Sequence, residues 1–212
     1  APLREIAAAC RTTAAPLLVD DAHGFGMLGA TGAGAVEEAG LGVDDVPILM
    51  CTLGKAAGTF GAFVAGSPML IESLLQRART YIYTTALPPA VAAATRESLR
   101  VMQDEPWRRS HVLEHAARFR AGLADLGLPS LPSRTPIQPV LIGAEAAAVV
   151  ASHALFDQGF WVPAIRPPTV PVGTSRLRFT FSASHTEAQV EQLLAALRTL
   201  RDCGVIKPTP AA

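Results

Sequence analysis

The sequence predicts an α/β protein, because apolar runs with the length of buried strands alternate with segments whose apolar residues recur at helical spacing. The 212 residues are 50% hydrophobic and include 18 basic and 18 acidic side chains. A chain of this length and composition can bury a substantial core, and it lacks the low hydrophobicity and high net charge of disordered chains. Because there is no excess of basic residues to neutralise phosphates, the balance also argues against nucleic acid as the main partner.

The first half of the chain is expected to form part of a parallel sheet with flanking helices. A helix is predicted over residues 3–13, where the apolar side chains share one side. Continuous apolar runs, typical of strands buried in a parallel sheet, occupy residues 16–19, 46–52 and 60–65. Ser67 and Pro68 are residue types preferred at the N-cap and first turn of a helix, and a further helix is predicted over 89–103.

The composition changes near residues 104–106, so we expect one domain over 1–104 and a smaller α/β domain over 105–212. Residues 176–182 alternate between apolar and polar side chains, as in a strand with one buried face. Thr186 and Gln189 have the spacing of a capping box, which predicts the start of the last helix. The other elements expected in this half are a helix ending at Gly127, a strand over 137–142, a helix near 144–158 and a strand near 160–165.

The cysteines and the hydropathy pattern indicate a cytoplasmic protein. Cys10, Cys51 and Cys203 are widely spaced and form no CxxC pair, which favours reduced thiols. No uninterrupted apolar run reaches the roughly 18 residues that a membrane span needs. The first residues lack the basic and then apolar order of a signal peptide. We therefore expect neither a membrane nor an export pathway to be involved.

Two glycine motifs suggest nucleotide binding only superficially. Gly24, Gly26 and Gly29 have the spacing of a dinucleotide-binding loop. That fingerprint requires the strand to run directly into the first glycine and a helix to begin at the last, and neither condition is met here. Gly54 and Lys55 lack the glycine and the Ser/Thr that complete a phosphate-binding P-loop. The sequence therefore favours no nucleotide site at either position.

A histidine pair suggests a metal site, and here too the alternative is favoured. His111 and His115 lie four residues apart on a predicted helix, which is the spacing of two ligands on one helix face. No third ligand is near in sequence, and several arginines on the same helix would repel a cation. We therefore expect a solvated helix face and no metal centre.

Polar residues follow two of the expected strands directly. Asp20, Asp21 and His23 come after the first apolar run, and Thr52 and Lys55 come at the end of the second. Open α/β sheets build their sites at the carboxyl ends of strands, which predicts a functional site here. The alternative interpretations are a surface turn for the first group and an exposed loop lysine for the second.

Together with two later segments, these residues resemble the α-oxoamine synthase family of pyridoxal 5'-phosphate (PLP) enzymes. The matching segments are 19–26 (VDDAHGFG), 52–56 (TLGKA), 81–89 (YIYTTALPP) and 166–178 (RPPTVPVGTSRLR). They occur in family order and extend over nearly the whole chain. The resemblance implies the aspartate aminotransferase-like fold (fold type I). Residues 1–104 would then be the C-terminal part of the PLP-binding large domain, and residues 105–212 the small C-terminal domain.

The resemblance also implies PLP as cofactor and a role for each matching residue. Lys55 would bind PLP covalently and act as general base, which requires an amine that can lose its proton. Asp20 would bond the protonated pyridine nitrogen and so keep the ring able to accept electrons. His23 would hydrogen-bond the phenolic oxygen, and Thr52 would contact the phosphate. Thr85 would reach a phosphate across the interface of a homodimer.

Arginines near the C-terminal end of the resemblance would bind substrate. Arg178 would bind the carboxylate of the amino acid, because a guanidinium pairs with a carboxylate through two parallel hydrogen bonds. Arg176 lies on the same face of the expected strand, so the alternation alone leaves the choice between the two open. Arg166 and Thr169 are expected to be further residues of the substrate pocket.

Within the family, the resemblance is greatest to members that condense L-alanine with a pimeloyl thioester, on CoA or on a carrier protein, in biotin biosynthesis. The alternatives are a glycine-using member such as the 2-amino-3-ketobutyrate ligase type, an aminotransferase of the same fold, or an inactive fragment. Family members are considerably longer, and the chain begins with Ala1. We therefore expect a part of a longer enzyme, weakly active or inactive alone, with an unpaired sheet edge and open apolar surface.

Overall fold

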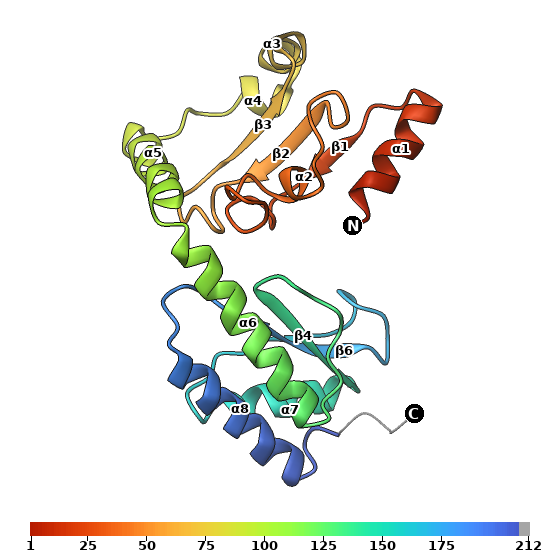
Figure 1. Ribbon diagram of the computed structural model, residues 1–212, viewed down its shortest axis with the longest axis vertical. Helices are drawn as coiled ribbons and strands as arrows, with labels where there is room; N and C mark the ends of the chain where they lie inside the picture. Colours follow the sequence, from red (N-terminus) through yellow and green to blue (C-terminus); the bar gives the residue numbers. More distant parts are fainter. Residues whose placement is uncertain (208–212) are drawn as a thin grey trace. The chain divides into compact units, whose positions relative to one another are not determined.

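The computed structural model describes residues 1–207 and divides into two compact units, Ala1–Arg109 and Ser110–Ala212, of which the second is described to residue 207 (Figure 1). Strands and helices alternate in both units, so the predicted α/β class is confirmed. None of the described helices combines the length and the apolar character needed to cross a membrane.

The first unit contains a three-stranded sheet in the order β1-β2-β3. β1 (Leu18–Asp20) runs parallel to β2 (Ile48–Thr52), with Asp20 opposite Met50. β3 (Ala62–Gly66) pairs with β2 in the antiparallel direction. All three predicted strands are present, but the expectation of a parallel sheet is wrong for the third. The physical reason is the connection: residues 53–61 form a short turn, whereas parallel neighbours need a long crossover.

The helices of the first unit differ in length, and two of them are a single turn long. The helices are α1 (Leu3–Thr13), α2 (Ala35–Glu38), α3 (Pro68–Arg77), α4 (Arg79–Ile82) and α5 (Pro89–Asp104). The predicted N-cap is confirmed, because the Ser67 hydroxyl accepts a hydrogen bond of 3.2 Å from the Leu70 amide. α2 and α4 were not expected from the sequence, since a single helical turn is too short to display a periodic pattern.

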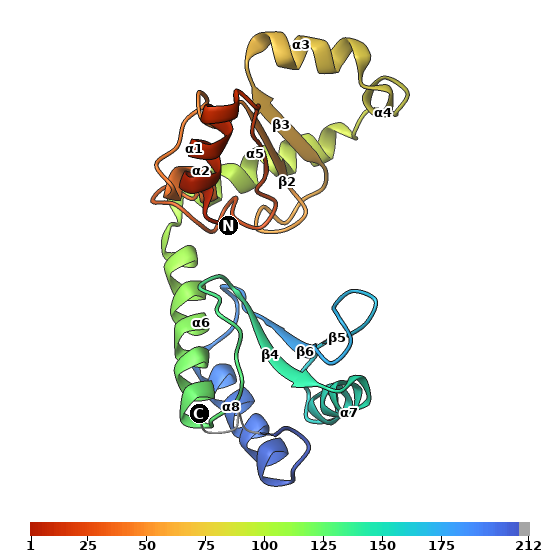
Figure 2. The same ribbon diagram turned by 90° about the vertical axis from the view of Figure 1, so that its right-hand side faces the viewer.

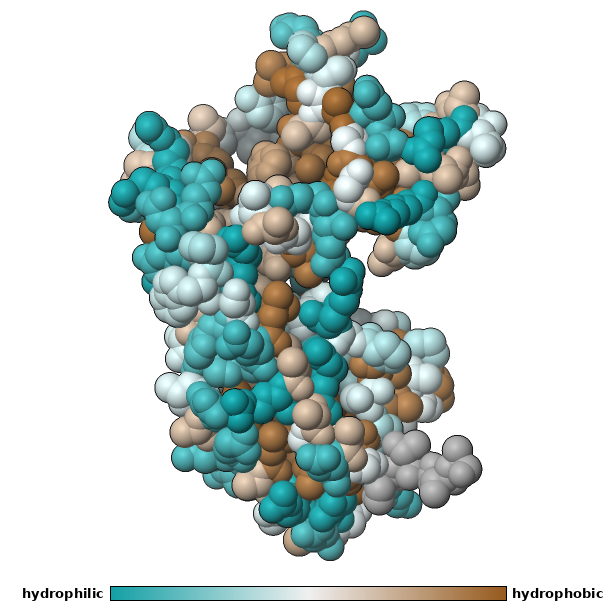
Figure 3. Space-filling view, viewed as in Figure 1, coloured by the Kyte–Doolittle hydropathy of each residue, from teal (hydrophilic) through white to brown (hydrophobic). Residues whose placement is uncertain are grey.

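The first unit leaves large apolar side chains in solvent. Met69 is 79% exposed, Tyr83 77% and Phe60 66%. No residue of α3, α4 or α5 is fully buried. Figure 3 shows hydrophobic side chains on the visible surface of this unit, between polar ones. The predicted open apolar surface is therefore observed, and surface of this kind is typical of regions that contact other protein.

The second unit is an antiparallel sheet covered by helices. Its strands lie in the order β4 (Ile137–Gly143), β6 (Ser175–Thr180), β5 (Ala164–Ile165). The helices are α6 (Trp107–Asp125), whose first residues belong to the first unit, α7 (Glu145–Phe156) and α8 (Glu187–Asp202). α7 contacts the sheet and α8, as Figures 1 and 2 show. β5 is shorter than predicted because it begins only after Pro163, which has no amide proton for a ladder.

The core of the second unit follows the predicted patterns closely. Leu177 and Phe179 of β6 are buried, while Arg178 between them is exposed. The Phe119 ring of α6 lies 4.8 Å from the Phe179 ring and 5.1 Å from the Phe181 ring, measured between centroids. The predicted capping box at the start of α8 is present and closes its first turn.

Candidate functional site

The carboxyl ends of β1 and β2 lie at the same edge of the first sheet, because the two strands are parallel neighbours (Figure 1). Asp20 is the last residue of β1, and Thr52 is the last residue of β2. The residues that follow them, His23 and Lys55, therefore lie on adjoining loops. The fold thus brings the two predicted groups of polar residues to one edge, as open α/β sheets do with their sites.

Asp20 and Asp21 are adjacent in sequence but have opposite environments. Asp20 is exposed, and its carboxylate accepts a 3.0 Å hydrogen bond from the Ala22 amide. Asp21 is only 4% exposed, and its carboxylate accepts a 2.6 Å hydrogen bond from the Ala35 amide. Burial raises the pKa of Asp21, although hydrogen bonds from two backbone amides oppose that shift. Only Asp20 is therefore placed to act on a group outside the protein core.

The end of β2 carries an unusual hydroxyl. The Oγ1 atom of Thr52 is fully buried and has no hydrogen-bond partner within residues 1–207. Its neighbour Cys51 is also buried, and burial together with the charges of Asp21 and Asp20 raises the pKa of its thiol to about 11. The two carboxylates of the β1 end thus act electrostatically on the β2 end, which agrees with a single site at this edge.

Lys55 lies in a tight turn between β2 and β3. The Gly58 amide donates to the Lys55 carbonyl at 3.0 Å, and the Thr59 amide donates to the Leu53 carbonyl at 2.9 Å. The Lys55 side chain is exposed, and in the part of the chain that the structure describes its ammonium group has no hydrogen-bond or ion-pair partner. An amine held on a closed turn and left without a partner can react with a ligand.

These residues fit PLP. A buried hydroxyl without a partner costs about 1–3 kcal/mol, and a phosphate oxygen would remove that cost at Thr52. Asp20 offers an exposed carboxylate to a protonated ring nitrogen, and Lys55 offers an amine for covalent attachment. A phosphate group, a cationic ring and a carbonyl carbon are the features of PLP that these groups match.

Thr85 is exposed in the segment between α4 and α5. Its neighbour Leu87 lies close to the turn that carries Lys55: a Cβ added at Gly61 would be 3.2 Å from the Leu87 side chain. The Gly61 carbonyl in turn accepts a 2.9 Å hydrogen bond from the Leu53 amide. The fold therefore brings the Thr85 segment and the Lys55 turn into contact within the same unit.

Arg176 and Arg178 both lie on β6 in the second unit, but their side chains have different surroundings. The Arg176 guanidinium donates to the Thr174 carbonyl at 3.1 Å and to the Thr174 hydroxyl at 3.2 Å. Arg178 is exposed, and its side chain has no partner among the described residues. Of the two candidates that the alternation leaves open, Arg178 is thus the one with a guanidinium available to a ligand.

Arg166 and Thr169 follow β5 in the same unit. The Arg166 guanidinium lies 2.8 Å from the Glu145 carboxylate, and both side chains are about half exposed. The Thr169 amide donates to the Arg166 carbonyl at 3.0 Å, which closes the turn around Pro167 and Pro168. Arg166 is therefore paired with an acidic side chain of the protein itself, unlike Arg178.

The expectation of a solvated histidine face on α6 is wrong. His115 is 3% exposed, and its Nε2 atom lies 2.9 Å from the His185 carbonyl. The Nε2 atom of His111 lies 3.2 Å from the same carbonyl. The loop before α8 covers both rings, and no local sequence pattern reports a partner so distant along the chain. Within residues 1–207, no group of three or more His, Cys, Asp or Glu side chains could hold a metal ion.

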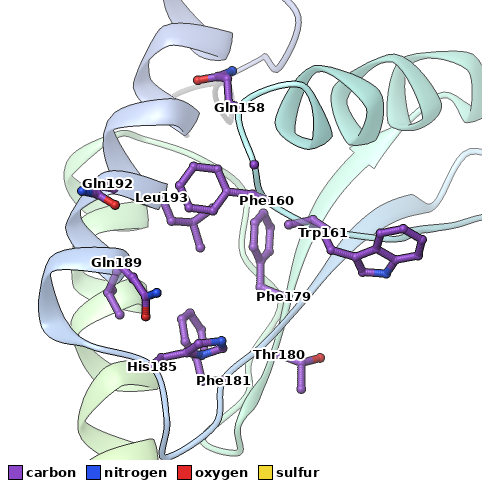
Figure 4. Close-up of a pocket in the computed structure, with 13 residues that line it drawn as sticks. Gln158, Phe160, Trp161, Phe179, Thr180, Phe181, His185, Gln189, Gln192 and Leu193 are labelled. Carbon is purple, nitrogen blue, oxygen red and sulfur yellow. The ribbon is translucent and has the colours of Figure 1, made fainter.

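A pocket of about 370 Å³ lies in the second unit, between the loop before β5, strand β6 and helix α8 (Figure 4). Aromatic side chains dominate its lining, and three glutamines add polar groups. None of the predicted site residues lines it, and its lining contains no Lys, Arg, Asp or Glu. The lining side chains labelled in Figure 4 are Gln158, Phe160, Trp161, Phe179, Thr180, Phe181, His185, Gln189, Gln192 and Leu193.

One residue that sequence reasoning left without a role is Asp21. From the sequence alone, the carboxylates of Asp20 and Asp21 look equivalent. Successive side chains of a strand point to opposite faces, so a doublet at a strand end must place one carboxylate inside and one outside. That alternation is the signal from which the different environments could have been predicted.

Comparison with known proteins gives the family and close relatives. The family model described as aminotransferase class I and II matches residues 1–197. The 8-amino-7-oxononanoate synthase of Cellvibrio japonicus is 58% identical over 207 residues, which are 98% of this chain and 52% of that protein. The synthase of the same name from Methylococcus capsulatus is 59% identical over 199 residues, 93% of this chain and 51% of that protein.

Solved structures agree with this. Serine palmitoyltransferase of Sphingomonas wittichii superposes with a TM-score of 0.91 at 35% identity, covering 98% of this chain and 52% of that one. The 8-amino-7-oxononanoate synthase of Francisella tularensis has a TM-score of 0.81 at 29% identity, with 94% and 59% covered. The predicted aspartate aminotransferase-like fold is confirmed, and the chain spans about half the length of the curated relatives it matches.

Proposed function

The chain belongs to the aminotransferase class I and II family, and from that premise we propose that it is part of a PLP-dependent acyltransferase that condenses L-alanine with a pimeloyl thioester and releases carbon dioxide. The identity of 54–59% to proteins named 8-amino-7-oxononanoate synthase supports this activity over the glycine-using and aminotransferase alternatives. Biotin biosynthesis is the corresponding pathway, and the acyl carrier is CoA or a protein.

The observation that carries the proposal is the edge at which β1 and β2 end. It holds an exposed carboxylate at Asp20 and, as far as residues 1–207 show, a buried hydroxyl without a hydrogen-bond partner at Thr52 and an ammonium group without a partner at Lys55. Each of these groups matches a different part of one cofactor.

PLP, when bound, supplies a cationic aromatic ring that takes up the electrons left at the α-carbon after proton removal. The Asp20 carboxylate would hold the proton on the ring nitrogen. The Lys55 amine would hold the cofactor covalently and would act as the general base for the α-proton of the amino acid. The Thr52 hydroxyl would donate to the phosphate, and the His23 imidazole would hydrogen-bond the phenolic oxygen.

The second unit supplies groups for the substrates in this proposal. Arg178 binds the carboxylate of L-alanine through its two parallel N–H groups. Arg166 and Thr169 contribute to the pocket for the acyl substrate. The assignment of residues 1–104 to the PLP-binding large domain and of 105–212 to the small domain belongs to the same proposal.

We also propose that the protein acts as a homodimer in the cytoplasm. The exposed apolar side chains of the first unit support association with a second copy, and Tyr81, Tyr83 and Leu87 flank Thr85 among them. In a dimer Thr85 would reach a phosphate of the other protomer. The three cysteines are free thiols, as suits a reducing compartment.

The test of cofactor attachment is borohydride reduction of the protein, expressed at its full natural length and incubated with PLP. We expect a stable adduct on Lys55 that the Lys55→Ala variant does not form. Lys207→Ala is the matched control, because Lys207 is the other lysine of the chain and is also exposed. An adduct that persists in Lys55→Ala would refute the assignment.

The test of the reaction compares CoA release from pimeloyl-CoA with L-alanine against glycine with acetyl-CoA or succinyl-CoA. Faster release with L-alanine and pimeloyl-CoA supports the proposal. Preference for glycine would assign the chain to the glycine-using members, and amino-group transfer without CoA release would make it an aminotransferase.

A further inference from the structure

Asp21 is a buried carboxylate to which the proposed chemistry gives no role. It follows the exposed Asp20 directly and is 4% exposed itself. Its backbone amide donates a 2.8 Å hydrogen bond to the Met50 carbonyl and so extends the pairing of β1 with β2. A carboxylate buried at this point needs several hydrogen-bond donors to offset its desolvation.

The Asp21 carboxylate contacts both ends of the glycine-rich loop, residues 24–34. The Ala35 amide, just after that loop, donates to Oδ2 of Asp21 at 2.6 Å, and Gly24, at its start, lies against Oδ1. A Cβ at Gly24 would lie 2.0 Å from Oδ1, and a Cβ at Gly34 would lie 2.0 Å from Oδ2. Only glycine at these two positions leaves room for the carboxylate.

These contacts enclose His23. The Asp21 carbonyl accepts hydrogen bonds from the Gly24 amide at 3.1 Å and from the Phe25 amide at 3.0 Å, which forms a turn with His23 inside it. The side chain and the main chain of Asp21 thus hold the same turn. The residues on the C-terminal side of His23, Gly24 and Phe25, are thus hydrogen-bonded back to Asp21.

We propose that Asp21 is a positioning residue for the cofactor: its carboxylate fixes the turn that presents the His23 imidazole to the phenolic oxygen, while Asp20 serves the ring nitrogen. This inference rests on the proposed function. The two carboxylates then have different tasks: Asp20 contacts the cofactor, whereas Asp21 acts on it only through His23.

Glu37 provides a matched control in the same loop. Its carboxylate accepts hydrogen bonds from the Thr31 amide at 3.0 Å and from the Ala33 amide at 2.9 Å. Like Asp21 it holds the backbone of the glycine-rich loop, but among the described residues the amides that donate to its carboxylate are those of Thr31 and Ala33, outside the turn over residues 21–25. A general loss of loop order should therefore follow from either substitution, whereas an effect through His23 should follow only from Asp21.

The experiment measures the dissociation constant of PLP by absorbance titration of the full-length apoprotein. The variants are D21N, H23N and E37Q, with the double variants D21N/H23N and E37Q/H23N. We expect D21N to weaken PLP binding about tenfold in the presence of His23 and less than about twofold in the H23N background, because coupled residues are non-additive. E37Q should change the constant by the same factor in both backgrounds.

An equal effect of D21N in both backgrounds, or no effect at all, would overturn the positioning role. G34A is a second variant that displaces the carboxylate without removing it, and it should show the same dependence on His23. If the unsubstituted protein forms no borohydride-stable PLP adduct, the proposed function fails, and that result is distinct from an additive cycle in a protein that binds PLP.

Discussion

The Thr52→Val substitution should stabilise the protein without cofactor and weaken its binding of PLP. The Thr52 hydroxyl is buried without a hydrogen-bond partner among residues 1–207. Leaving a hydroxyl in this state costs about 1–3 kcal/mol, and valine fills nearly the same volume without the polar atom. We therefore expect the free energy of unfolding of the apoprotein to rise by about 1 kcal/mol.

The effect on cofactor binding has the opposite sign. A hydrogen bond to a charged group contributes about 1.5–3 kcal/mol, so its loss corresponds to about 10- to 150-fold weaker binding. Urea denaturation of the apoprotein and absorbance titration with PLP measure the two quantities separately. A gain in apoprotein stability together with a loss of PLP affinity indicates a hydroxyl that binds a ligand, whereas a hydroxyl that stabilises the fold would lower stability when removed.

Thr95→Val is the control within the same unit. The Thr95 hydroxyl donates to the Val91 carbonyl at 2.8 Å and lies 3.0 Å from the Thr59 hydroxyl, so its removal should destabilise the apoprotein and leave PLP affinity unchanged. If Thr52→Val instead lowered apoprotein stability and left PLP affinity at the wild-type value, the hydroxyl would have no role in phosphate binding.

Three further predictions concern the packing and ionisation of the core. Phe119→Ala should cost about 3–5 kcal/mol in chemical denaturation, because the ring is fully buried against Phe179, and a loss below 1 kcal/mol would contradict that packing. Gly122→Ala should cost about 1–3 kcal/mol, because the new Cβ would lie 2.4 Å from a methyl carbon of Leu194; an unchanged melting temperature would show that this side chain moves freely. The free energy of unfolding should fall as the pH rises from about 9 to about 11. The reason is the Cys51 thiol, whose pKa is about 11 in the folded protein and about 9 in the unfolded chain, so that it ionises first in the unfolded state. The decrease is at most about 2.7 kcal/mol, and Cys51→Ala should remove it from a pH series of urea denaturations.

The elements that could be predicted from sequence are those in which buried and exposed side chains recur at a regular spacing. Residues 176–182 alternate apolar and polar side chains, and β6 buries the residues that this alternation selects. A continuous apolar run such as 60–65 predicts a strand but contains no information on its direction. The direction of β3 is set by the short turn before it, because antiparallel neighbours alone can be joined so closely.

The site too could be predicted only where local sequence determines the position of a residue. Asp20 and Lys55 could be located because strand ends determine where their loops begin. The environment of His115 could not, because the carbonyl that it contacts belongs to His185, at a sequence separation of 70. Local patterns report which face of a helix is apolar, but a polar side chain can be buried by a loop that no local pattern reveals.

The glycine-rich loop matches the glycine spacing of the dinucleotide-binding fingerprint, but its glycines have another structural reason. In the dinucleotide fingerprint, glycines allow the backbone to approach a phosphate. Here Gly24 and Gly34 allow the backbone to approach the carboxylate of Asp21, with which a Cβ at either position would collide. The acidic group that the loop surrounds thus belongs to the protein itself. A carboxylate buried by strand alternation needs amide donors, a loop that approaches it closely needs glycine, and this requirement accounts for glycine at positions 24 and 34 without any nucleotide.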